Sequence, residues 1–163
     1  MNCPECNSAV MATVNENHLY AECGLPNVTL KGVLVRRCPN CGAHLVSIPK
    51  LSQLHRAIAL TLINKPERLT PAEIRFLRKS LGWSGADFAR KLHTRPEQVS
   101  RWESEASAAT MSISNELLLR LLVAHGQRID AYSENLEKVA SLKDAVPAVL
   151  SLQRQDGDWY QAA

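Results

Sequence analysis

The chain has 163 residues, of which 45% are hydrophobic and 21% are charged, which is typical of one globular domain or two small ones. No apolar run is long enough to span a bilayer, and the first residues lack the basic and apolar segments of a secretory signal, so we expect a cytoplasmic protein. The net charge of +3 is too small to indicate nucleic-acid binding by itself. Residues 65–126 carry the basic excess, with 10 Lys and Arg against 7 Asp and Glu.

Two CxxC pairs, Cys3 with Cys6 and Cys38 with Cys41, lie in the first quarter of the chain. Four thiolates at this spacing surround one zinc ion tetrahedrally. A thioredoxin-like redox pair would need a single CxxC beside a βαβ pattern, and a catalytic zinc would need an open coordination position. We therefore predict one structural Zn²⁺ per chain, bound by these four cysteines.

The residues around these pairs predict a small β-sheet stapled by the metal. Cys23 lacks a CxxC partner, and we interpret it as a free, partly buried thiol. His44, three residues after Cys41, remains a weaker alternative ligand. Removing the metal is expected to unfold residues 1–45 and to spare the helical domain. Strand-like segments span residues 11–14, 18–21 and 28–37, and a turn at residues 24–27 lies between the last two.

Residues 48–67 are expected to form a linker helix. Pro49 and Pro66 bracket a helical repeat that is too apolar for a free linker, so the helix should dock on the C-terminal domain or on a partner chain. His55 on this helix is expected to lie at the surface or to fill the core. The repeat consists of Leu51, Leu54, Ile58 and Leu62.

Residues 84–103 predict two short helices joined by a tight turn. Ser84 is a candidate N-cap, with Asp87 three residues later. Thr94 is the predicted cap of the second helix, and Pro96 lies in its first turn. The first helix buries Phe88, Ala89 and Leu92, and the second buries Val99 and Trp102. The second helix leaves Arg95, Glu97, Gln98 and Arg101 on its outer side.

Two longer helices should cover this pair, since helices this short are not stable alone. Thr70 begins a capping box, and Gly82 supplies the stop of that helix. The second runs over residues 112–125 with an apolar face of Ile113, Leu117, Leu118, Leu121 and Leu122.

The predicted fold is a small N-terminal β zinc-binding domain plus an all-α helix-turn-helix, phage-repressor-like C-terminal domain. The predicted boundaries are residues 1–47, 48–67 and 68–126. Residues 127–163 are expected to be a C-terminal helical extension, with one helix over 129–139 that is a candidate for dimerisation and a short one near 149–152. Whether Trp159 and Tyr160 belong to a frayed tail, a dimer contact or the chain's own core stays open.

Residues 68–126 resemble the phage-repressor (XRE-like) class of helix-turn-helix, through Ala89 and the run Val99–Glu103. That class usually has glycine at the turn, where this chain has His93, a residue type that tolerates a left-handed backbone better than most. It often has a phosphate-gripping glutamine where this chain has Gly85, so that contact should be missing or moved.

The order of the two modules resembles the MqsA/YgiT-type zinc-finger antitoxin and regulator family, from Cys3 to about His125. The resemblance implies that the metal domain faces a partner toxin, while the C-terminal domain dimerises and represses the promoter of its own operon. It also places Arg101 at a base-reading position.

The second short helix supplies the candidate base contacts. Arg101 matches guanine N7 and O6, and Gln98 matches adenine or a phosphate. Glu97 would either accept from cytosine or cap its own helix through Thr94. The alternative for Arg101 is a surface ion pair with a glutamate one turn away. Candidate phosphate contacts are Arg95, Lys91, Arg90 and Ser84, and Ser100 belongs to the run that matches the family.

These observations favour a sequence-specific regulator that binds double-stranded operator DNA as a homodimer, with a toxin as a further partner. The alternative is a zinc-stapled protein-interaction module or a free-standing regulator without a toxin. No nucleophile–base pair, phosphate loop or open metal site is evident, so we expect no enzymatic activity and predict no catalytic residues.

Overall fold

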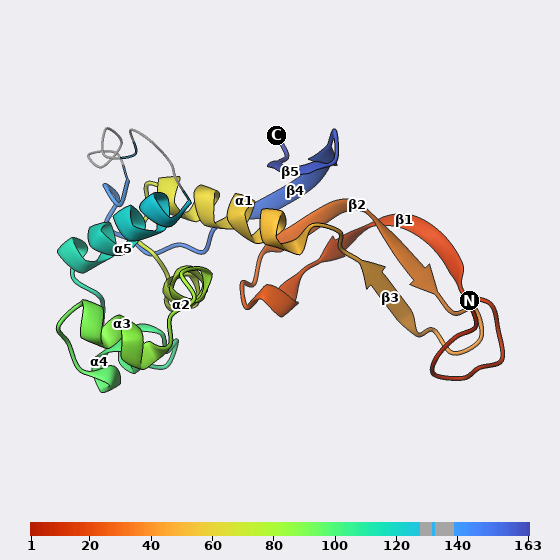
Figure 1. The fold of residues 1–163 in the computed structure, drawn as a ribbon, viewed down its shortest axis with the longest axis horizontal. Helices are drawn as coiled ribbons and strands as arrows, with labels where there is room; N and C mark the ends of the chain where they lie inside the picture. The colour runs from red at the N-terminus through yellow and green to blue at the C-terminus, as the bar shows by residue number, and fades with distance from the viewer. Residues whose placement is uncertain (128–131, 133–138) are drawn as a thin grey trace.

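The computed structural model describes residues 1–127, 132 and 139–163. Figure 1 shows an elongated molecule with helices α2 to α5 at one end, the β1–β2–β3 arm at the other, and α1 with β4 and β5 between them. The strands are β1 (Ala12–Leu19), β2 (Val28–Arg37), β3 (His44–Ser47), β4 (Leu150–Gln155) and β5 (Asp158–Gln161). The helices are α1 (Leu51–Asn64), α2 (Pro71–Ser80), α3 (Gly85–Lys91), α4 (Pro96–Trp102) and α5 (Ile113–Gly126), with a 3-10 turn at Ala21–Cys23.

The N-terminal arm is built on the long strand β2. Strand β1 pairs with it antiparallel, and β3 pairs antiparallel with its last four residues. The two strands predicted at residues 11–14 and 18–21 are one strand, because the pairing with β2 continues past a register shift between Glu16 and His18. The predicted turn at residues 24–27 is confirmed and follows the 3-10 turn, with Gly24 at φ +86°.

The C-terminal segment completes this sheet. Strand β4 runs parallel to β2, with Val28 opposite Leu150 and Leu30 opposite Leu152, and β5 pairs antiparallel with β4. The predicted short helix near residues 149–152 is therefore wrong, and the end of the predicted helical extension consists of strands. Alternate residues Leu150 and Leu152 are buried, which is the period of a half-buried strand. The helix predicted over 129–139 lies mostly outside the described residues.

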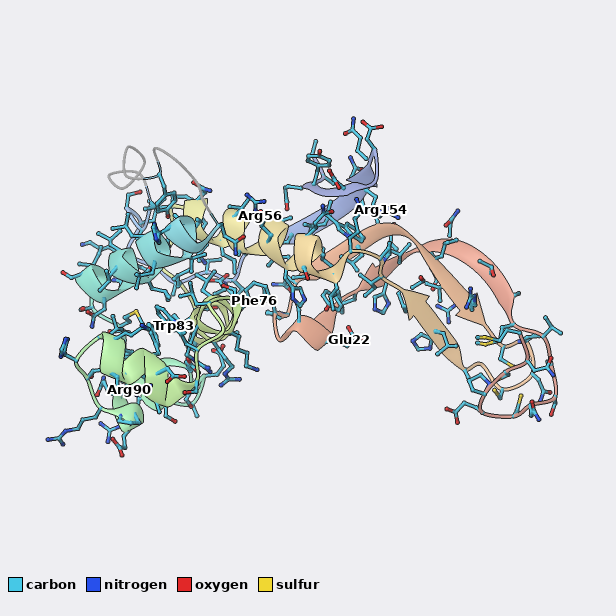
Figure 2. The ribbon with its side chains drawn as sticks, viewed as in Figure 1. Glu22, Arg56, Phe76, Trp83, Arg90 and Arg154 are labelled. Atoms are coloured by element: carbon cyan, nitrogen blue, oxygen red, sulfur yellow. The ribbon has the colours of Figure 1, made fainter. Side chains whose placement is uncertain are left out.

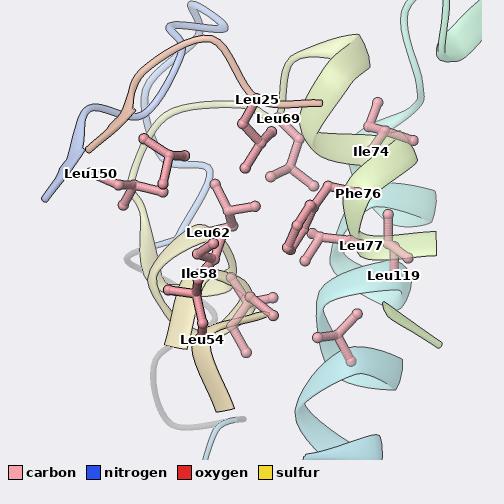
Figure 3. Packing of buried hydrophobic residues seen from close by; sticks show 14 of the residues in the cluster. Leu25, Leu54, Ile58, Leu62, Leu69, Ile74, Phe76, Leu77, Leu119 and Leu150 are labelled. Carbon is pink, nitrogen blue, oxygen red and sulfur yellow. The ribbon is translucent and has the colours of Figure 1, made fainter. Parts of the chain in front are cut away.

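Helix α1 joins the two halves of the molecule through its buried face. Figure 3 shows Leu54, Ile58 and Leu62 packed between Leu150 of β4 and the α2 residue Phe76. The predicted docking of this helix on the C-terminal domain is thus confirmed, although the same face also covers the sheet. The exception is Leu51, which lies at the first turn and is exposed.

Polar contacts also join the tail to the two residues that precede α1. The indole Nε1 of Trp159 donates to the carbonyl of Pro49 at 3.0 Å, and Lys50 Nζ donates to Asp158 at 2.9 Å. Trp159 is buried and belongs to the chain's own core, whereas its neighbour Tyr160 is 49% exposed.

The helical domain follows the predicted caps closely. Thr70 and Ser84 each form a complete capping box with the acidic residue three positions later, and Ser112 caps α5. The predicted Thr94 cap is wrong. Arg95 is the N-cap of α4 and makes no side-chain cap hydrogen bond.

Helix α5 buries a different face from the predicted one. Ile113 and Leu118 are 48% and 40% exposed, while the buried residues are Glu116, Leu119, Arg120, Val123 and Ala124. The prediction counted only apolar residues. Glu116 and Arg120 are buried because they pair with each other at 2.9 Å and bond to backbone groups that would otherwise be unsatisfied.

One large core and one small cluster hold the described residues together. The large core runs from Tyr20 and the inner part of β2 through α1 to α5 and β4. The small cluster at the tip of the arm contains Cys3, Met11 and Cys38. No helix in the described part of the chain is long and apolar enough to cross a membrane.

Candidate metal centre and nucleic-acid interface

Four cysteine sulfurs converge at the tip of the arm. The Sγ atoms of Cys3, Cys6, Cys38 and Cys41 all lie within 4.8 Å of one another. The separations Cys3–Cys41 and Cys6–Cys38 are both 3.6 Å. Sulfurs placed about 2.3 Å from a central ion at tetrahedral angles would lie about 3.8 Å apart. The four predicted ligands are therefore positioned to bind a metal ion.

Each CxxC pair is shaped by its own backbone turn. The amide of Asn7 donates to the backbone carbonyl of Cys3 at 2.9 Å, and the amide of Gly42 donates to the backbone carbonyl of Cys38 at 3.1 Å. Both donors have a positive φ, +52° for Asn7 and +74° for Gly42. Asparagine and glycine adopt this left-handed conformation most readily. The two turns thus present their sulfurs toward a common centre.

The thiols of this cluster differ in acidity. A hydrogen bond from the Ser8 backbone, helped by the Asn40 side chain, lowers the pKa of Cys6 to about 6. The Ala43 backbone lowers the pKa of Cys41, but hydrogen bonds with the neighbouring thiols and burial outweigh it and raise that pKa to about 12. Hydrogen bonding to the Cys41 backbone also lowers the pKa of Cys38, so the cluster combines thiols that lose their protons readily with one, Cys41, that does not. A bound divalent ion would favour the thiolate form of all four.

The remaining candidates of the N-terminal half lie apart from this centre. Cys23 is a half-buried free thiol that donates to the Tyr20 carbonyl at 3.1 Å, and burial raises its pKa. His44 is exposed on β3 and is not part of the group of possible ligands. His55 is half-buried at the edge of the core, where its Nε2 is 3.0 Å from the Tyr20 hydroxyl and burial lowers its pKa.

Helix α4 presents the predicted base-reading side chains outward. Val99 and Trp102 are buried as predicted, whereas Gln98 is half-buried. Arg101 forms no ion pair within the described residues, so the predicted alternative of an ion pair with a neighbouring glutamate is not seen. Arg95, Glu97, Ser100 and Arg101 are exposed. The structure brings these residues together on one outward face.

The turn before α4 has the predicted left-handed residue. His93 has φ +51°, and the amide of Thr94 donates back to the carbonyl of Ala89 at 2.9 Å. The turn therefore keeps α3 and α4 in the helix-turn-helix arrangement without a glycine.

Sequence reasoning missed the residue that anchors the end of α4. Glu103 is buried and accepts from Arg78 Nε at 2.5 Å and from Arg78 Nη2 at 2.8 Å. Arg75 Nη2 donates to the carbonyl of Glu103 at 2.6 Å. A bidentate arginine–carboxylate pair fixes both distance and orientation. Helix α2 thereby sets the angle at which α4 is presented.

A groove of about 720 Å³ lies beside α4, between its N-terminal end and the start of α5. None of its lining residues is acidic or aliphatic, and every one can donate a hydrogen bond. They are His93, Thr94, Arg95, Gln98, Trp102, Thr110, Ser112 and Asn115. Such a lining suits an anion that carries several acceptor oxygens, as a phosphate does.

Comparison with known proteins agrees with this arrangement. A protein-family model described as helix-turn-helix (HTH_3) matches residues 74–126, a region that begins within α2 and ends with α5. The searches of curated proteins and of solved structures gave no match. The fold and the family match together identify residues 74–126 as a helix-turn-helix domain of the XRE type and support a role for the chain in DNA-binding regulation.

Proposed function

We propose that this protein is a sequence-specific transcriptional regulator that binds double-stranded operator DNA through α4. The observation that carries the proposal is the exposed α4 face, on which Arg101 has no ion-pair partner among the described residues, next to a groove whose lining residues can each donate a hydrogen bond. A guanidinium without a partner is free to donate two parallel hydrogen bonds to guanine. Glu97 and Gln98 extend this reading surface, and the neighbouring groove receives the phosphate backbone. No enzymatic step is proposed.

Zinc is the proposed metal. Four thiolates in a closed tetrahedral arrangement suit Zn²⁺, and such a site leaves no position for substrate. When bound, the ion holds the two cysteine turns together. The chain's own residues then supply the partner-facing and DNA-facing surfaces.

We further propose that the protein is a homodimeric antitoxin that represses its own operon, as the family resemblance implies. Two exposed leucines on the arm support a protein partner there. Leu34 and Leu45 are 50% and 40% exposed, and the pairing of β2 with β3 places them on one face of the sheet. Exposed apolar residues on α5 likewise offer a surface for a second copy. Co-purification with the product of an adjacent toxin-like gene would support the antitoxin role, and its absence would favour the free-standing regulator.

Replacing Arg101 by alanine should weaken operator binding by about 1–3 kcal/mol without changing the thermal stability of the fold. The loss should be smaller on a scrambled duplex, because a base-reading side chain contributes mainly to the specific complex. Fluorescence anisotropy of the zinc-loaded protein on its own upstream DNA, at fixed salt, measures both affinities.

The matched control is Arg36→Ala. Arg36 is exposed on β2, far from α4, and its replacement changes the net charge by the same amount. Equal losses for Arg36→Ala and Arg101→Ala would show only general charge attraction. Unchanged affinity for Arg101→Ala would remove Arg101 as a reader.

A further inference from the structure

The structure distinguishes between the three side chains of α3 that were predicted to contact phosphate. Ser84 Oγ donates to Asp87 Oδ2 at 2.7 Å and accepts from the Asp87 amide at 3.1 Å. Arg90 forms an ion pair with the other oxygen of Asp87. Both residues are therefore engaged with the cap of their own helix. Lys91 has no carboxylate partner among the described residues, so its charge is uncompensated.

Lys91 is nevertheless held in place. Its Nζ lies 4.8 Å from the centroid of the Trp83 ring, within the range of a cation–π contact. A contact of this kind orients the ammonium without neutralising it. An acidic partner would have to be displaced before a phosphate could bind, whereas the aromatic ring does not compete for the charge.

Trp83 is itself held by one contact to its ring and one to its backbone. It packs on Phe88 of α3 with ring centroids 6.3 Å apart, and the Trp83 carbonyl accepts from Arg78 Nη1 at 2.7 Å. The same Arg78 holds Glu103 at the end of α4. Figure 2 labels Trp83 at the junction of α2 and α3, on the side of the molecule that carries the helix-turn-helix.

We propose that Trp83 is a positioning residue for DNA binding, which holds Lys91 as the backbone-phosphate contact of α3. This inference rests on the proposed function. Gly85, at the first position of α3, has no side chain that could reach a phosphate. Lys91, oriented over the ring that immediately precedes the cap, supplies the cation on this side of the motif.

A double-mutant cycle tests the inference, with affinities for the upstream DNA measured by anisotropy at several salt concentrations. Lys91→Ala should reduce the slope of log affinity against log salt by about 0.9, the value for one phosphate contact. Trp83→Leu should lower the affinity about two- to five-fold, the range that an exposed cation–π contact supports. Trp83→Phe should restore most of it, and Trp83→Leu should have no further effect once Lys91 is alanine.

Arg90→Ala is the matched control, since it removes the same charge from the adjacent position but a charge already paired with Asp87. An equal fall in slope for Arg90→Ala and Lys91→Ala overturns the assignment of Lys91. If Trp83→Leu lowers the DNA affinity as much in the Lys91→Ala background as in the wild type, Trp83 has a merely structural role and the inference is overturned. Wild-type binding is measured first. Binding that a scrambled duplex removes equally well overturns the proposed function, and the inference with it, whereas the two preceding outcomes leave the proposed function intact.

Discussion

Replacing Arg120 by methionine is expected to lower the free energy of unfolding by about 3–5 kcal/mol, the cost of breaking a buried ion pair from one side. Arg120 has no exposed surface. Its Nη1 donates to the carbonyls of Ile63 and Lys65 at 3.0 and 2.8 Å. Its Nη2 donates to the backbone carbonyl of Glu67 at 2.8 Å and to the carboxylate of Glu116 at 2.9 Å. Methionine retains apolar volume but no donor. The Glu67 carbonyl and part of the Glu116 carboxylate would then lose their donor, and the Ile63 and Lys65 carbonyls would keep only the Tyr132 hydroxyl and the Ala140 amide.

Urea denaturation, monitored by circular dichroism, measures this change in the free energy of unfolding. Arg56→Met is the matched control, because Arg56 links the same two helices through one exposed hydrogen bond to the Gln127 carbonyl. It should cost no more than about 0.5 kcal/mol, as a surface substitution does. In a Glu116→Gln background, Arg120→Met should cost less than in the wild type, since the two residues share one network. A loss below about 1 kcal/mol for Arg120→Met would contradict a structural role for this arginine.

Features set by a few neighbouring residues could be predicted from the sequence. The capping boxes at Thr70 and Ser84 depend on one side chain and the residue three positions later. The left-handed turn at His93 and the four-cysteine cluster also follow from local spacing. The cap of α4 was misplaced by one residue because Thr94 and Arg95 both precede Pro96, and only the geometry of the turn selects Arg95.

Features set by distant partners could not be predicted in the same way. Leu150 and Leu152 alternate with polar residues over too short a segment to distinguish a strand from a helix. The strand forms because β2 offers an unpaired edge more than a hundred residues earlier in the chain. The buried face of α5 was missed for a related reason. Glu116 and Arg120 become favourable in the core only when the end of α1 supplies acceptors.

The same long-range pairing changes what metal removal should do. The sequence led us to expect unfolding of residues 1–45 as a unit. Val28 and Val35 of β2, however, belong to the large core that also contains α1 and α2. Only the small cluster around Cys3, Met11 and Cys38 depends on the cysteine centre.

Chelation of the metal from the zinc-loaded protein should therefore unfold the tip of the arm and leave the inner sheet folded. The amides of Asn7 and Gly42, which donate within the two cysteine turns, should lose their protection in hydrogen exchange. The amides of Tyr20 and Leu150, which donate to Val28 and Asn27 in the inner sheet, should keep it. A metal bound by four thiolates stabilises the segments that carry its ligands, whereas the inner sheet is stabilised by the large core.

Hydrogen exchange with mass spectrometry, before and after chelation, locates the change. Cys6→Ala should reproduce the pattern without chelator, because three thiolates bind zinc more weakly than four. Cys23→Ala is the matched control, since Cys23 is a free thiol outside the cluster and its loss should leave the arm protected. Loss of protection in α1 or β4 on chelation would show that the metal supports the whole core. Unchanged protection at Asn7 and Gly42 would show that the cysteine turns fold without it.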